Sequence, residues 1–249
     1  MKKIITTIII LFTTFSNCYA SSDEIFEPDG IIPSLRPINP TIVEKMFNSQ
    51  LSLDCMATPQ ITPSSINLDK IHLSNNLIRK QGAARRARGH YIQVIGKIVD
   101  EDCVPISNAA VQIWQTDSAG KYERQYKLAS QWDQMDPDFD PNFNYSGTAQ
   151  TNNLGHFAFL TILPISNEEN TAPHINMTIK HPDFEPLTTI MYFNKHPRNE
   201  FDRKLKEISD DERELVTAKG TPLDPQNISE GRLYRHLITL EGINKYRRY

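Results

Sequence analysis

The segment TAPHINMTIK, residues 171–180, places a histidine at the start of an alternating pattern. Apolar residues alternate there with His174, Asn176 and Thr178. On a β-strand these three polar side chains share one face, because successive side chains point to opposite sides. A histidine at the start of such a stripe is either a hydrogen-bonded polar residue or a metal ligand. The pattern alone leaves both interpretations open.

Six short segments carry the signals of β-strands. Each is rich in β-branched or aromatic residues and is bounded by Gly, Pro, Asn or Asp. Since no periodic helices separate most of them, we expect an all-β fold, an antiparallel β-sandwich. The segments are 91–100, 109–117, 156–164, 174–180, 187–194 and 234–242.

One or two peripheral helices are expected outside the sandwich. Ser209 and Glu212 have the spacing of a capping box, which predicts a helix that begins after Ser209. Gly220 is placed to end this helix. A second, short helix is expected near residues 40–50, within a Pro- and Ser-rich stretch.

The first twenty residues have the pattern of a secretory signal peptide. Lys2 and Lys3 precede a short apolar stretch, and Ala20 suits cleavage. We therefore expect a secreted or periplasmic protein. No later stretch is long and apolar enough to span a membrane. The chain divides into a signal peptide, residues 1–20, an extended N-terminal arm, residues 21–88, and one sandwich domain, residues 89–249.

Charge and cysteine content limit the partners and the compartment. Without the signal peptide, 25 basic residues stand against 30 acidic ones, and this acidic balance argues against a nucleic-acid partner. Cys55 and Cys103 remain after cleavage. In an oxidising compartment such a pair usually forms a disulfide, which here would tie the arm to the first hairpin. Two separate buried thiols are the alternative, because spacing alone does not show proximity.

Two longer segments resemble the intradiol ring-cleavage dioxygenases, the family of protocatechuate 3,4-dioxygenase and catechol 1,2-dioxygenase. VDEDCVPISNAAVQIWQTDSAGKY, residues 99–122, resembles the first β-hairpin of that family nearly residue for residue. DPNFNYSGTAQTNNLGHFAFLTILP, residues 140–164, resembles a second family segment without a gap. PHIN, residues 173–176, falls where the family has P-x-H-I-H. The clear resemblance covers residues 89–195.

The resemblance implies ferric iron chemistry. In the family two tyrosinates and two histidines hold Fe(III), which binds a catechol and activates it toward O2. An arginine just upstream of the histidines supports the anionic intermediate. His174 takes the position of the first ligand histidine. Asn176 stands at the second histidine position, and Thr171 stands at the arginine position.

Neither tyrosine ligand of the family has a clear counterpart. The loop where one should lie reads ISNEENTA and contains no tyrosine. The other should lie a few residues before Asp140, but the nearest candidate, Tyr126, is fourteen residues away. Tyr145 replaces a small residue beside the family's site and is a further candidate, as a ligand or as a filling of the vacated pocket. Tyr192 matches the family's own strand tyrosine, whose expected role is packing.

The sequence leaves three functions open. The favoured one is a non-catalytic binding protein that needs no cofactor and takes a small aromatic ligand, since a fold outlasts its site. The second is an active non-haem iron dioxygenase that acts on a catechol-type aromatic through a rebuilt Fe(III) ligand set. The third is a non-catalytic partner subunit, because protocatechuate dioxygenases pair a catalytic chain with a related chain that lacks the ligands. Assembly as a homo-oligomer or as a paired subunit is compatible with these functions.

Overall fold

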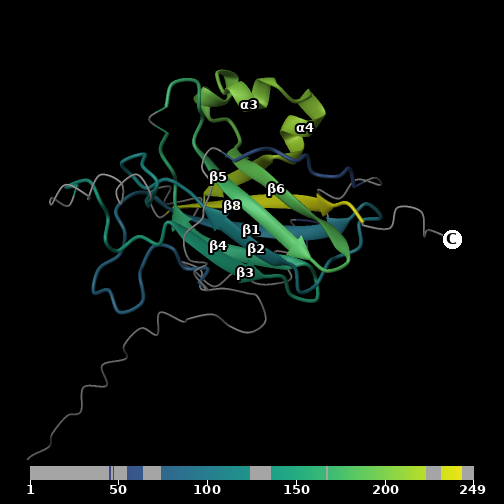
Figure 1. Ribbon diagram of the computed structural model, residues 1–249, viewed down its shortest axis with the longest axis horizontal. Coiled ribbons are helices and arrows are strands. Elements are labelled where there is room, and N and C mark those ends of the chain that lie inside the picture. Colours follow the sequence, from purple (N-terminus) through teal and green to yellow (C-terminus); the bar gives the residue numbers. More distant parts are fainter. Residues whose placement is uncertain are drawn as a thin grey trace, which may run out of the picture.

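A computed structural model of the chain shows a mostly β protein with a few short helices (Figure 1). The expected signal peptide and Tyr126 lie outside the described residues. So does most of the expected helix near residues 40–50, of which Lys45 and Phe47 are helical. The described residues are 45, 47, 55–63, 74–123, 136–166, 168–222 and 231–242.

Eight strands lie side by side in one curved sheet, in the order β3-β2-β5-β6-β7-β8-β1-β4. The two end strands, β3 and β4, approach each other, so the sheet is nearly closed. The strands are β1 (Tyr91–Asp100), β2 (Ala110–Trp114), β3 (Ser146–Gln150), β4 (His156–Ile162), β5 (His174–His181), β6 (Phe184–Phe193), β7 (Thr217–Pro222) and β8 (Arg232–Leu240).

The prediction of an all-β fold is confirmed, but the prediction of a purely antiparallel sandwich is wrong. β1 pairs with β8 in parallel, and β6 pairs with β7 in parallel. A parallel pair needs a crossover connection, and the insertion between β6 and β7 supplies one. Alternation within a strand is the same for either direction of pairing, so the sequence did not reveal this. The insertion contains η2 (Pro197–Glu200), α3 (Arg203–Lys206) and α4 (Asp210–Leu215).

The helix predicted after Ser209 begins as expected and ends early. The side chain of Ser209 accepts the N–H of Glu212, and the carboxylate of Glu212 accepts the N–H of Ser209, which completes a capping box. The helix nevertheless ends at Leu215. Gly220 lies in β7 and not at a helix end, and a Cβ there would sit 2.5 Å from Cε1 of Tyr234. The glycine therefore makes room for an aromatic ring on the neighbouring strand β8.

Residues 74–77 of the arm close the gap between the two ends of the sheet. On the β4 side, the N–H of Leu77 donates to the carbonyl of Leu160 at 2.7 Å. On the β3 side, the N–H of Thr148 donates to the carbonyl of Ser74 at 3.0 Å. The segment thus provides partners for both edge strands, whose backbone groups would otherwise be unpaired. This part of the arm belongs to the folded core.

Residues 55–63 of the arm form backbone hydrogen bonds with β8 and β6. The N–H of Thr58 donates to the carbonyl of Thr239 on β8 at 3.0 Å. At the start of this segment, a disulfide joins Cys55 to Cys103, and the two Cα atoms are 5.4 Å apart. Cys103 lies in the turn between β1 and β2, so the bond ties the arm to the first hairpin.

Replacing both cysteines, Cys55→Ala with Cys103→Ala, should lower the free energy of unfolding by about 4 kcal/mol, because the bond closes a loop of 48 residues in the unfolded chain. Urea denaturation of the oxidised protein and of the variant measures the difference. Adding reductant should lower the stability of the wild type and leave that of the variant unchanged. Equal stability of the two proteins would contradict the prediction.

His236 is a buried titratable residue in the middle of β8, opposite Gly96 of β1. Its Nε2 atom has no hydrogen-bond partner among the described residues. Burial lowers the pKa of His236 from 6.5 to about 4, because a charged imidazole loses its hydration there. The folded protein therefore resists protonation of this ring, whereas the unfolded chain does not.

Stability should fall as the pH falls from about 6.5 to about 4, because the unfolded state binds a proton on His236 that the folded state excludes. The full effect corresponds to about 3 kcal/mol. Urea denaturation across this pH range should show a smaller loss for His236→Gln than for the wild type. The matched control, exposed His90→Gln, should keep the loss of the wild type, and an identical loss in all three proteins would refute the prediction.

Candidate active site

His174 is the first residue of β5, and its ring is held at both nitrogens. Nδ1 lies 2.7 Å from the carbonyl oxygen of Ala172, so this nitrogen carries the proton and donates it. Nε2 therefore has a lone pair, which lies 3.2 Å from the hydroxyl of Tyr122. Burial lowers the pKa of His174, which favours the neutral ring. The ring acts as an acceptor toward Tyr122.

Asn176 lies two residues along β5, on the same face as His174, and it is fully buried. Its Nδ2 group donates to the hydroxyl of Tyr122 at 3.0 Å and to the carbonyl of Trp114 at 3.3 Å. The Tyr122 hydroxyl thus accepts from Asn176 and donates to His174. One phenol group satisfies two buried polar side chains.

Asp202 connects this network to the helical insertion. Its carboxylate is buried and accepts the N–H of Ala172 at 2.8 Å, the hydroxyl of Tyr192 at 3.1 Å and the N–H of Leu205 at 3.0 Å. The last bond caps α3 at its N-terminus. Asp202 thereby fixes Ala172, whose carbonyl orients the ring of His174.

Tyr192 is buried beside this carboxylate. Burial, and then the negative charge of Asp202, raise the pKa of Tyr192 well above its usual value. The phenol is consequently protonated and donates to the carboxylate. A tyrosinate ligand cannot come from this residue without breaking that hydrogen bond, which agrees with the packing role expected from the sequence.

Two cavities lie near His174. The inner cavity, bounded by Thr116, Tyr122, Ile165 and His174 among others, has a volume of about 10 Å³. Such a space holds roughly one water molecule, whereas a cavity that accepts benzene measures roughly 150 Å³. The inner cavity is therefore too small for an aromatic ring.

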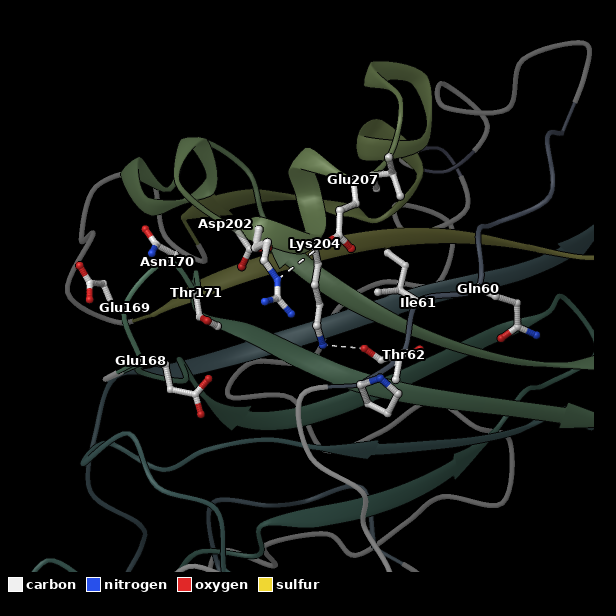
Figure 2. Close-up of a pocket in the computed structure, with 13 residues that line it drawn as sticks. Gln60, Ile61, Thr62, Glu168, Glu169, Asn170, Thr171, Asp202, Lys204 and Glu207 are labelled. Carbon is white, nitrogen blue, oxygen red and sulfur yellow. Dashed lines mark hydrogen bonds and ion pairs between the residues drawn. The ribbon is translucent and has the colours of Figure 1, made fainter.

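The outer cavity is much larger, at about 720 Å³ (Figure 2). Glu168 and Thr171 line both cavities, so they form the wall between them. The outer cavity is lined by residues 60–63 of the arm, residues 168–171 before β5, and residues 202–204, 207 and 208 around α3.

The structure brings together only some of the residues that the sequence suggested. Thr171, at the family's arginine position, lines both cavities. The hydroxyl of Tyr145 donates to Oδ2 of Asp117 at 2.9 Å, so this phenol already has a carboxylate partner. Sequence reasoning missed Tyr122 and Asp202. Tyr122 was visible only as the last residue of the hairpin motif, and Asp202 had no signal beyond its position before a short helix.

The described residues do not fit the ferric site that the resemblance implies. Among them, no group of three or more His, Cys, Asp or Glu side chains is placed to hold a metal ion. Around His174 they offer one neutral imidazole, the neutral amide of Asn176 and the phenol of Tyr122. Fe(III) prefers anionic oxygen ligands, and the phenol here is engaged as a hydrogen-bond donor.

The family model described as "Dioxygenase" matches residues 68–219, more than half of the chain. The chain belongs to the intradiol ring-cleavage dioxygenase family. A Rickettsia typhi protein with a provisional dioxygenase name is 32% identical over 178 residues, which are 70% of this chain and 82% of that protein. The protocatechuate 3,4-dioxygenase beta chain of Burkholderia cepacia is 33% identical over 46% of this chain and 49% of its own length.

Another relative, a Rickettsia bellii protein with a provisional dioxygenase name, is 35% identical, and the match spans 56% of its length. Solved dioxygenase structures share the fold of this intradiol dioxygenase family member. The 3-chlorocatechol 1,2-dioxygenase of Rhodococcus opacus matches 81% of this chain and 78% of its own, with a TM-score of 0.56 and 17% identity. The dioxygenase domain of a Streptomyces carbohydrate-binding fusion matches 75% and 99%, with a TM-score of 0.56 and 20% identity.

Tyr122→Phe should lower the free energy of unfolding by about 2 kcal/mol, because it leaves two buried groups without their shared partner. Urea denaturation at neutral pH measures the change. Tyr91→Phe is the matched control, since its hydroxyl makes one hydrogen bond, to the carbonyl of Ala87. The control should lose about 1 kcal/mol or less. Equal losses in the two variants would show that Tyr122 does not have this role.

Proposed function

We propose that this protein is an exported member of the intradiol dioxygenase family that binds a small ligand and does not cleave aromatic rings. The hydrogen bond between Tyr122 and Nε2 of His174 is the observation that carries the proposal. Nε2 is the nitrogen that would bind a metal ion, because Nδ1 carries the proton. The hydroxyl of Tyr122 already occupies Nε2. Asn176 at the second histidine position supplies a weak ligand for iron in place of a strong one.

Two further observations support the loss of ring cleavage. Thr171 has no positive charge with which to stabilise an anionic intermediate, unlike the arginine that the family places there. The inner cavity has no room for a catechol next to His174. A ligand of that size would have to bind in the outer cavity.

The alternative of an active iron dioxygenase keeps one specific observation in its favour. A metal-bound histidine typically donates its other N–H to a carbonyl or carboxylate, and Nδ1 of His174 donates to Ala172. His174 therefore has the tautomer that a metal ligand needs, and Tyr122 would have to turn away from Nε2 to leave this nitrogen for the metal. The third alternative, a partner subunit, is supported only by the name of the Burkholderia cepacia relative, which is the beta chain of protocatechuate 3,4-dioxygenase.

Export is proposed from the N-terminal sequence and is supported by the cysteine pair. A disulfide between Cys55 and Cys103 persists in an oxidising compartment and is rare in a reducing one. Among the described residues, no helix is both long and apolar enough to cross a membrane.

The purified protein should be colourless and should contain far less than one iron per chain, because the described ligands do not suit Fe(III). It should also consume no O2 with catechol or protocatechuate. Asn176→His should not restore activity, since it adds one imidazole and no tyrosinate. Metal analysis, the visible spectrum and an oxygen electrode measure these properties. Stoichiometric iron in the wild type that is lost in His174→Ala would overturn the proposal.

A further inference from the structure

Residues 58–62 of the arm, the strap, lie across the sheet. Thr58 forms two hydrogen bonds with Thr239 on β8, because its N–H donates to the carbonyl of Thr239 and its hydroxyl accepts the N–H of Thr239, both at 3.0 Å. Further along the strap, the N–H of Ile61 donates to the carbonyl of Thr188 on β6 at 2.9 Å. The strap is therefore held by the backbones of two strands.

The strap also forms part of one wall of the outer cavity. Residues 60–63 line the cavity on the side opposite residues 168–171 (Figure 2). The carbonyl of Thr62 accepts the ammonium group of Lys204 on α3 at 2.6 Å. The side chain of Ile61 is buried between the sheet and the insertion, in a cluster with Ala172, Ile190, Tyr192, Leu205 and Val216. The cavity consequently loses this wall whenever the strap leaves the sheet.

The disulfide between Cys55 and Cys103 fixes the chain just before the strap. Its two ends differ in exposure. Cys55 is buried, whereas Cys103 is partly exposed in the turn between β1 and β2 and is followed by exposed Val104. Thiol–disulfide exchange requires access to one sulfur, and exposed disulfides are the labile ones. A reductant in solution can therefore reach the sulfur of Cys103 in the folded protein.

We propose that this disulfide is a redox switch for the outer cavity. With the bond closed, the strap stays on the sheet and the wall of the cavity is complete. With the bond open, only the hydrogen bonds of the strap and the buried side chain of Ile61 hold it, and it detaches more often. The cavity is thus complete in an oxidising compartment and incomplete beside a dithiol reductant. This inference rests on the proposed binding role, since it describes how that site is regulated.

Chain entropy gives the direction of the effect. In the oxidised protein, a detached strap is a loop whose ends are fixed by the disulfide and by residues 74–77, which pair with β3 and β4. Opening the disulfide frees one end and raises the entropy of the detached strap, whereas the docked strap is unchanged. Further upstream, Phe47 is buried against the ring of His156 on β4 and still holds the arm. The reduced strap should therefore open locally while the sheet stays folded.

A dithiol of the dithiothreitol class supplies the two electrons and two protons that reduction consumes. Its thiolate attacks the sulfur of Cys103, which forms a mixed disulfide and releases Cys55 as a thiolate that takes up a proton. The second thiol of the reductant then attacks the reductant's own sulfur in the mixed disulfide. This step releases Cys103, which is protonated in turn, and closes the oxidised reductant into a ring. Two protein thiols and one cyclic disulfide result.

Hydrogen exchange followed by mass spectrometry tests the switch on the full protein, before and after treatment with dithiothreitol. The amides of Thr58 and Ile61 donate to β8 and β6, so their exchange reports detachment of the strap. Reduction should speed this exchange about tenfold or more, because the detached strap gains entropy. The amides of β5 should stay protected over the same labelling time. Unchanged exchange of the strap would overturn the inference, and so would simultaneous exchange of the strap and β5, which reports global unfolding.

Variants separate the disulfide from the other contacts of the strap. Cys55→Ala combined with Cys103→Ala should exchange as the reduced wild type does and should not respond to dithiothreitol. Ile61→Ala keeps the disulfide and should speed exchange of the strap in the oxidised protein, with a further increase on reduction. Met56→Ala is the matched control, because Met56 lies beside the disulfide with an exposed side chain, and it should respond as the wild type does. A variant of Ile61 that ignores reduction would refute the switch even if the double cysteine variant does not fold.

The two proposals fail in distinguishable ways, because exchange of the strap is measured without any ligand. Iron in stoichiometric amount with ring cleavage would refute the proposed function, whatever the exchange data show. A colourless, iron-free protein whose strap exchanges equally slowly in the oxidised and reduced forms would refute only the redox switch.

Discussion

Two buried polar side chains on one face of β5 have to find hydrogen-bond partners, and the way they do so organises the candidate site. His174 and Asn176 both use the hydroxyl of Tyr122. Leaving either group unpaired in a dry environment would cost free energy. The arrangement holds only if the ring of His174 is neutral and correctly turned, which depends on the carbonyl of Ala172. Asp202 in turn fixes Ala172 and begins α3.

The same hydrogen bonds connect the sheet to its insertion. The carboxylate of Asp202 accepts hydrogen bonds from Tyr192 on β6 and from Ala172, two residues before β5. The crossover between β6 and β7 is therefore anchored at its midpoint by a buried carboxylate. The arm has a similar role at the other end of the sheet, where residues 74–77 pair with β3 and β4. Segments outside the strands thus complete both the sheet and the site.

Ring cleavage in the family requires room for a catechol beside the ligand histidine. In this chain the large cavity lies elsewhere. Beside His174 the space has closed to about 10 Å³, and a phenol hydroxyl lies against the ring nitrogen. Outside it, a space of about 720 Å³ is walled by opposite charges. A fold can lose the ligands of a metal without losing its strands, because burial of apolar surface and not the metal holds the sheet together. Under the proposed function, the insertion and the arm supply the surface that binds the ligand.

The sequence by itself predicted six of the eight strands, but not β3 or β7, and it carried the resemblance to the family. Alternation and turn residues are local signals, and a histidine replaced by Asn176 is visible without coordinates. The tertiary structure alone decided the parallel pairs, the role of Tyr122 and the existence of the outer cavity. Tyr122 and His174 are 52 residues apart, and Thr62 and Lys204 are 142 residues apart. Contacts over such separations depend on how the whole chain packs, and no local pattern in the sequence encodes them.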